Sequence, residues 1–187
     1  MILMITNYST SITPKNDPWE AYIDVAETGQ LSLTNIEITT TTLCNMRCEH
    51  CAVGYTLSPK DPEALPLELI IQRLDEIPTL RAFSITGGEP MMSMKSVREY
   101  VVPLLKYAHE RGARTQINSN LTMPLERYDL IIPYLDVLHI SHNYGSVDNF
   151  HLIGFAHAER KPGEKQREAM FNRMIDNAKS LTSRGVL

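Results

Sequence analysis

The sequence lacks several features that mark whole classes of protein. It has no excess of basic residues, since 18 Lys and Arg stand against 22 Asp and Glu, and its net charge is −4. Binding to nucleic acid through phosphate neutralisation is therefore not expected. It also has no long apolar run: Met1–Ile5 is too short to span a bilayer and lacks the flanks of a secretory signal. We expect no membrane association and a cytoplasmic location.

Cysteine is scarce, but the few cysteines lie together. The chain has only three, Cys44, Cys48 and Cys51. An odd, clustered set cannot form a disulfide framework, because each disulfide consumes two thiols and no others are available. In a reducing compartment, clustered thiols more often bind metal or take part in redox chemistry. The spacing therefore predicts a metal or redox centre.

The length and composition favour one globular core. At 187 residues with 43% apolar content, the chain is long enough for one sizeable core and short for two domains. We expect residues 1–33 to form a lead-in segment and residues 34–187 to form the core.

Strand and helix patterns alternate from Asn35 onward. Runs of β-branched and apolar residues predict strands, and apolar positions spaced by three and four predict helices. Pro103 predicts a kink or two abutting helices within the second helical stretch. The predicted strands are 35–43, 81–86, 113–118 and 136–141, the predicted helices are 67–77, 94–111, 124–134 and one after 163, and a polar loop is expected over 142–163.

This alternation predicts an α/β fold with a parallel sheet, because a helix must return the chain between parallel strands. Polar or glycine-rich clusters follow all four strands, and the carboxyl ends of parallel strands form one edge. These clusters are the cysteine loop, Gly87–Pro90, Asn118–Asn120 and Ser141–Asn143. We therefore expect them to build one site.

The last residues, Ser183–Leu187, are typical of a helix end followed by the start of a fifth strand. A complete barrel of eight strand–helix units takes about 250 residues. We expect this chain to be a portion of a larger protein, or to pair with a second chain that supplies the missing strands.

The spacing C-x3-C-x2-C favours an iron–sulfur cluster. Thiolates are the usual ligands of such clusters, and three of them would leave one iron of a four-iron cluster open to a small molecule. The alternative is a structural zinc site, which usually has four ligands in paired knuckles. Here the nearest further ligand, His50, lies between two of the cysteines.

With Gly87-Gly88-Glu89-Pro90 after the second strand, the cysteine loop resembles that of the radical S-adenosylmethionine (radical SAM) superfamily. The resemblance covers residues 36–187, and within the superfamily the chain is similar to the amino-terminal part of YfkAB-type proteins. It implies a partial (β/α)6 TIM-like barrel, truncated here after about four strand–helix units.

The resemblance also implies site residues. The cluster ligands would be Cys44, Cys48 and Cys51. The residues that contact S-adenosylmethionine (SAM) would be Gly87, Gly88, Glu89, Asn118, Asn120, Ser141 and His142, with Asn143 as an alternative to His142. His50 departs from the family pattern, in which an aromatic Tyr or Phe is commoner before the last cysteine.

The implied activity is reductive cleavage of SAM by a [4Fe–4S] cluster, giving methionine and a 5′-deoxyadenosyl radical that abstracts hydrogen from a substrate. A low-potential donor such as a flavodoxin would supply the electron. The rival hypothesis is a non-catalytic remnant or subunit that binds the cluster only.

Other candidate ligands have simpler interpretations. We expect His142, His151 and His157 to be solvated loop residues, although a polar connection of about twenty residues can also act as a lid or substrate loop. Methionines 91, 92 and 94 are expected to pack in the core.

Overall fold

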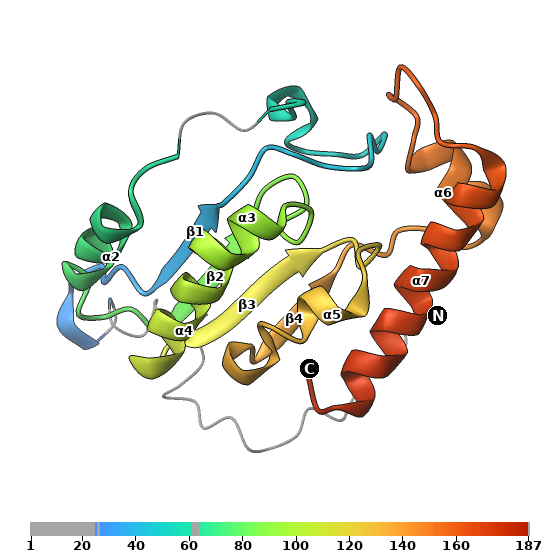
Figure 1. Cartoon of the computed structure of the whole chain (residues 1–187). Coiled ribbons are helices and arrows are strands. Elements are labelled where there is room, and N and C mark those ends of the chain that lie inside the picture. Colours follow the sequence, from blue (N-terminus) through green and yellow to red (C-terminus); the bar gives the residue numbers. More distant parts are fainter. Residues whose placement is uncertain (1–24, 26, 61–63, 187) are drawn as a thin grey trace.

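The computed structural model describes residues 25, 27–60 and 64–186, so most of the predicted lead-in lies outside the described residues. Figure 1 shows strands and helices alternating along the described chain. The elements are β1 (Asn35–Thr39), η3 (Gly54–Thr56), α2 (Leu67–Asp75), β2 (Ala82–Thr86), α3 (Met94–Ser96), η4 (Val97–Val101), α4 (Val102–Glu110), β3 (Arg114–Ser119), α5 (Leu125–Tyr128), η5 (Ile132–Tyr134), β4 (Val137–Ile140), α6 (Val147–Ile153) and α7 (Glu164–Ser183).

The four strands form one parallel sheet in the order β1-β2-β3-β4. This confirms the predicted α/β class. The sheet is open rather than closed into a barrel, and within residues 25, 27–60 and 64–186 no fifth strand joins it. The helix α7 ends at Ser183, as predicted, and residues 184–186 after it form a turn that joins no strand, while residue 187 lies outside the described part.

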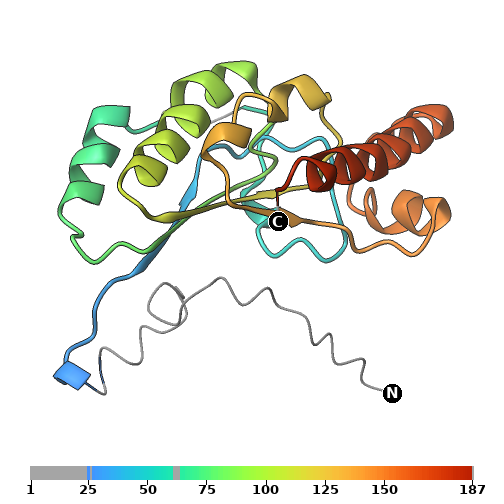
Figure 2. The same ribbon diagram turned by 90° about the horizontal axis from the view of Figure 1, so that it is seen from below.

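The two faces of the sheet differ in chemistry. Apolar side chains of all four strands point toward the helices, and Phe83, Ile85 and Ile117 are fully buried there. Figure 2 shows the helices α2, α4 and α5 on one side of the sheet. The alternate positions, such as Glu37 and His139, are exposed on the other side. Strand periodicity places the core on one face only.

The second predicted helical stretch, 94–111, is interrupted as expected from Pro103. It consists of α3, the π-helical turn η4 and α4, with Pro103 in the first turn of α4. Proline has no amide hydrogen to donate within a helix, and Pro103 lies where the π-helical turn η4 passes into α4. A π-turn just before it adjusts the register of the helix.

Three predicted segments differ clearly from the structure. The first strand, predicted to reach residue 43, ends at Thr39 because the chain beyond it leaves the regular ladder to meet the Gly87–Pro90 turn. The helix predicted over 124–134 divides into α5 and η5, and Pro133 lies in the second piece. The loop predicted over 142–163 contains α6, whose first turn is capped by the side chain of Ser146.

The helix α7 packs against the end of β3. Its apolar side chains Met174 and Leu181 are buried, and Asn177 is only 4% exposed among them. The Asn177 amide nitrogen donates to the carbonyl oxygens of Leu121 and Met123, both at 2.8 Å. Leu121 has a positive φ of 56°, which a non-glycine residue rarely adopts. Asn177 therefore holds a strained turn in place. No helix in the described part of the chain is long and apolar enough to cross a membrane.

We expect Asn177→Ala to lower the free energy of unfolding by about 1–3 kcal/mol, because two buried carbonyl groups lose their donor. Urea denaturation followed by circular dichroism measures the change. Asn172→Ala, at an exposed position of the same helix, is the matched control and should change stability by less than about 0.5 kcal/mol. Equal losses in both variants would contradict this role for Asn177.

Candidate functional site

The carboxyl ends of the four strands lie along one edge of the sheet, as parallel pairing requires. The cysteine loop, residues 40–53, follows β1 and crosses this edge toward α6 (Figure 1). The Gly87–Pro90 turn follows β2, Asn120 follows β3, and Ser141 follows β4. The sequence-predicted clusters therefore come from the same edge.

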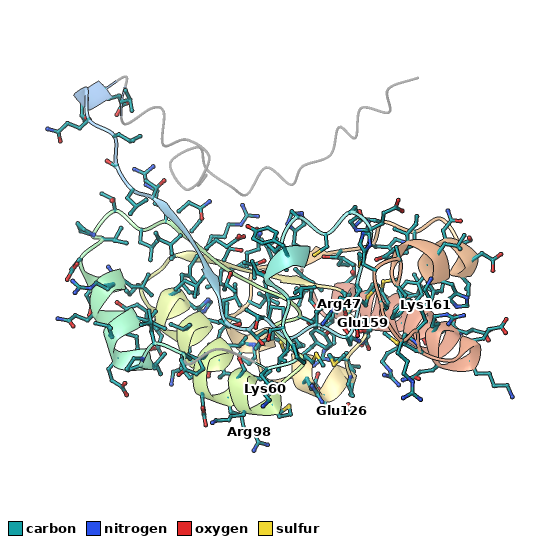
Figure 3. The ribbon with its side chains drawn as sticks, turned by 90° about the horizontal axis from the view of Figure 1, so that it is seen from above. Arg47, Lys60, Arg98, Glu126, Glu159 and Lys161 are labelled. Carbon is teal, nitrogen blue, oxygen red and sulfur yellow. The ribbon has the colours of Figure 1, made fainter. Side chains whose placement is uncertain are left out.

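The cysteine loop is fastened to the segment around the end of α6. The Arg47 amide donates to the Gly154 carbonyl at 3.0 Å, and the Arg47 carbonyl accepts from the His157 amide at 3.0 Å. Figure 3 labels Arg47 in this region. Met46 is 2% exposed, and a side-chain carbon at Gly154 would lie 2.7 Å from its methyl carbon. Gly154 therefore lets α6 approach the loop closely.

The Gly87–Pro90 turn lies directly against the start of the cysteine loop. The amide of Gly88 donates to the Thr41 carbonyl at 2.8 Å, and the amide of Glu89 donates to the Leu43 carbonyl at 2.7 Å. Side-chain carbons at Gly87 and Gly88 would lie 2.4 Å and 2.1 Å from the carbonyl oxygens of Thr41 and Leu43. Gly87 also has φ of +142°, which favours glycine. Both glycines are required for this approach of two backbones.

Glu89 points inward rather than to the open edge. It is 1% exposed, and its carboxylate accepts from the Asn120 amide at 2.7 Å, the Ser119 hydroxyl at 2.8 Å and the Met91 amide at 3.1 Å. Burial raises the pKa of this carboxyl, and the hydrogen bonds act against that rise. The side chain therefore braces the ends of β2 and β3 against each other.

Asn120 belongs to a closed ring of hydrogen bonds with the cysteine loop. Its amide nitrogen donates to the Asn45 side-chain oxygen at 3.0 Å, and the Asn45 amide nitrogen donates to the Thr122 hydroxyl at 2.7 Å. The Thr122 hydroxyl in turn donates to the Asn120 side-chain oxygen at 2.7 Å. The ring ties the end of β3 to the cysteine motif. Sequence reasoning missed Asn45, whose only signal was its place directly after Cys44.

The three cysteines are free thiols in half-buried positions. Burial raises the pKa of the Cys44 thiol from 9.0 to about 12, against a hydrogen bond from the Met46 amide. Burial also raises the pKa of Cys48, whereas a hydrogen bond with the Tyr144 hydroxyl at 3.2 Å lowers it. Cys48 and Cys51 line a cavity of about 310 Å³. Burial therefore favours the protonated forms of Cys44 and Cys48, and binding of a positive centre would displace those protons.

The remaining predicted residues lie apart from this network. Asn118 points to the face of the sheet opposite the helices, where its amide nitrogen donates to Glu37 at 3.3 Å. Ser141, His142 and Asn143 are exposed. The side chains of Asn143 and His50 are 2.9 Å apart, so the loop after β4 reaches the cysteine motif.

The predicted solvated histidines divide into two kinds. His142 and His157 are exposed, as expected. His151 is half-buried on α6, and its ring lies 6.3 Å from that of Phe150.

The methionine Met91, which was predicted to pack in the core, is fully buried.

Within the described ranges, no group of three or more His, Cys, Asp and Glu side chains converges tightly enough to hold a single metal ion. A zinc site would need such a group, whereas the ligands of a four-iron cluster bind separate irons.

The family model of the radical SAM superfamily matches residues 38–186. This chain belongs to the radical SAM superfamily. It is also 68% identical over 176 residues to the protein YfkA of Bacillus subtilis (strain 168), which confirms the resemblance to YfkAB-type proteins. That match covers 94% of this chain and 47% of YfkA, so the chain spans about half the length of this relative.

Two solved structures of one protein share the fold. Streptococcus suis SuiB bound to S-adenosylmethionine has a TM-score of 0.53 and 17% identity, over 86% of this chain and 36% of SuiB. SuiB bound to the precursor peptide SuiA has a TM-score of 0.58 and 19% identity, over 99% of this chain and 40% of SuiB. At these identities the likeness concerns the fold alone. It agrees with a partial TIM-like barrel, of which the described residues of this radical SAM chain form four strands.

We expect Gly88→Ala to destabilise the protein by about 1–3 kcal/mol, because the added methyl group would overlap the Leu43 carbonyl. Chemical denaturation measures the loss. Gly163→Ala is the control, since no atom lies within 4 Å of the carbon it adds. It should change stability by less than about 1 kcal/mol. If Gly88→Ala is as stable as the control, the close approach of turn and loop is not required.

Proposed function

We propose that this chain is the core of a radical SAM enzyme that holds a [4Fe–4S] cluster on Cys44, Cys48 and Cys51. The observation that carries the proposal is the cysteine loop itself. It lies at the carboxyl edge of a parallel sheet, fastened to the Gly88 backbone on one side and to Gly154 on the other, in a chain that belongs to this superfamily.

The residues of the loop suit such a cluster. The three sulfurs are thiols free of disulfides and half-buried, so they are accessible to iron and partly shielded from water. Arg47 donates from its guanidinium group to the carbonyls of Cys44 and Met46, at 2.8 Å and 2.7 Å. These bonds hold the loop in a fixed turn, which lowers the entropy cost of gathering three ligands.

When bound and reduced, the cluster would supply the electron that cleaves the sulfonium of SAM into methionine and a 5′-deoxyadenosyl radical, which then takes hydrogen from a substrate. The chain's own residues would bind the cofactor and orient it. Backbone carbonyl oxygens of Gly87 and Gly88 would receive the methionine ammonium, because an ammonium donates hydrogen bonds and a carbonyl accepts them. Asn118, Ser141 and His142 offer polar groups for the ribose and carboxylate.

Two of the predicted contacts take a different role in this proposal. The carboxylate of Glu89 is engaged by three groups of the chain, and Asn120 is engaged in the ring with Asn45 and Thr122. We assign both residues to fixing the ends of β2 and β3 relative to the cysteine loop, rather than to contacting the cofactor through their side chains.

The electron requires a partner. Reductive cleavage of a sulfonium needs a cluster at the low end of the range of about −700 to +450 mV. The proposed donor is a flavodoxin-like protein, and the proposed location is the cytoplasm, where such donors and free thiols are maintained.

We further propose that residues 34–187 are the radical SAM core and residues 1–33 a lead-in, and that additional strands from outside these residues complete the barrel. The open sheet and the 47% coverage of YfkA support this. The same open sheet favours the second candidate function, a subunit or remnant that binds the cluster without cleaving SAM.

We expect anaerobic reconstitution with iron and sulfide to give a brown protein with about four irons per chain and a broad absorption in the visible blue. Replacing Cys44, Cys48 or Cys51 by Ser should lower the iron content at least severalfold. Iron analysis and electron paramagnetic resonance (EPR) of the dithionite-reduced protein are the measurements. A colourless protein that binds one equivalent of zinc would exclude the cluster.

Addition of SAM and dithionite to the reconstituted chain separates the two candidate functions. Release of 5′-deoxyadenosine, measured by liquid chromatography, supports the enzyme. A cluster without this release supports the subunit or remnant. The triple cysteine variant serves as the control for cleavage that does not depend on the cluster.

A further inference from the structure

Tyr144 lies in the loop after β4 and points at the cysteine motif. Its hydroxyl oxygen is 3.2 Å from the sulfur of Cys48. The side chain is 5% exposed, so this contact is largely protected from water. Neither the sequence patterns nor the comparisons assign this residue a role.

The ring of Tyr144 is held firmly. It stacks edge-to-face on Phe150, with centroids 5.0 Å apart and planes at 88°. Phe150 is fully buried on α6 and in turn contacts Phe155 and Phe171, with centroids 5.5 Å and 5.6 Å apart. An aromatic ring fixed on such a cluster leaves its hydroxyl few positions to occupy.

A second contact fixes the loop after β4 next to the cysteine motif. Asn143, the preceding residue, has its amide nitrogen 2.9 Å from the Nε2 atom of His50. The two adjacent residues therefore contact two parts of the cysteine motif. Asn143 contacts His50, which lies between the cysteines, and Tyr144 contacts the sulfur of Cys48. The loop after β4 is therefore placed by contacts at both residues, and Tyr144 does not depend on the Cys48 contact alone for its position.

The direction of the Tyr144–Cys48 hydrogen bond follows from the chemistry of the ligand. A cysteine that binds iron is a thiolate and has no proton to give, so the hydroxyl must donate. A donor to a negatively charged acceptor makes a stronger bond than one between neutral groups. Reduction adds negative charge to a cluster and its sulfurs, so the bond stabilises the reduced form more than the oxidised form. Hydrogen bonds to the sulfurs are among the factors that set cluster potentials.

We propose that Tyr144 is a positioning residue that donates a hydrogen bond to the Cys48 sulfur and raises the reduction potential of the cluster. This inference rests on the function proposed above. The hydrogen bond makes the cluster easier to reduce, so that its electron donor can more readily supply the electron that SAM cleavage consumes.

The test compares the reconstituted chain with Tyr144→Phe, which removes the hydroxyl and keeps the packed ring. An anaerobic redox titration followed by EPR gives the midpoint potential. We expect the ratio of reduced to oxidised cluster, at the midpoint potential of the unaltered chain, to fall about three- to tenfold. A tenfold fall corresponds to about 59 mV for one electron. Resonance Raman spectra should show altered iron–sulfur stretching frequencies.

Tyr107→Phe is the matched control. It removes the hydroxyl of another tyrosine, one that donates to Asp75 and accepts from Arg111, away from the cysteine loop. The potential of this variant should equal that of the unaltered chain.

The opposite substitution keeps the inference testable if Tyr144→Phe fails to take up iron. Tyr144→3-fluorotyrosine keeps the ring and makes the hydroxyl a stronger donor, so the potential should rise. An unchanged potential in either loaded variant overturns the role of Tyr144 and leaves the proposed function standing. Failure of the unaltered chain to assemble a cluster overturns the proposed function itself.

Discussion

The contact between the backbones of Gly88 and Leu43 is the constraint on which the candidate site depends. The chain leaves β1 at Thr39, yet its next residues stay beside the turn that follows β2, through hydrogen bonds of 2.8 Å and 2.7 Å. Only glycine fits at this distance, because a side-chain carbon would meet a carbonyl oxygen at 2.1 Å. The first cysteine follows Leu43 directly. Its position is therefore set by main-chain contacts on a rigid sheet, and the rest of the loop extends from there.

Buried polar groups then fix the other strand ends relative to this contact. Glu89 receives three hydrogen bonds from β3 and its own turn, and the ring of Asn45, Asn120 and Thr122 joins β3 to the cysteine motif. Each of these groups would cost free energy if it were buried alone, so the arrangement holds only when all partners are in place. Such networks favour one geometry over its near alternatives. That is what a site with three ligands on one loop requires.

Much of this could be predicted from sequence because it depends on local patterns. The strands, the parallel sheet and the gathering of strand ends follow from periodicity and from the handedness of crossovers. The orientation of side chains could not be predicted. The family resemblance implied that Glu89 and Asn120 contact SAM, and their places after strands agreed with it, but whether such a side chain faces the edge or the interior depends on distant partners. The helix α6 was missed because its 7 residues carry one buried apolar side chain, Phe150, too few for a periodic signal. Asn45 and Tyr144 were missed because their hydrogen-bond partners lie 75 and 96 residues away in the sequence.

The face of the sheet opposite the helices differs in chemistry from the face that the helices cover. On the helix side, Ile38, Ile85 and Ile117 are paired across the strands and supply apolar burial. On the other side, the same strands present Glu37, Gln116 and Asn118, which are linked to one another and to Ser84 by hydrogen bonds of 3.3–3.5 Å. Among the described residues, hydrogen bonds satisfy these polar groups, so this face carries little of the desolvation cost that an exposed apolar sheet would bring. Within this part of the chain, apolar burial therefore stabilises one face of the sheet, and the other face presents polar groups.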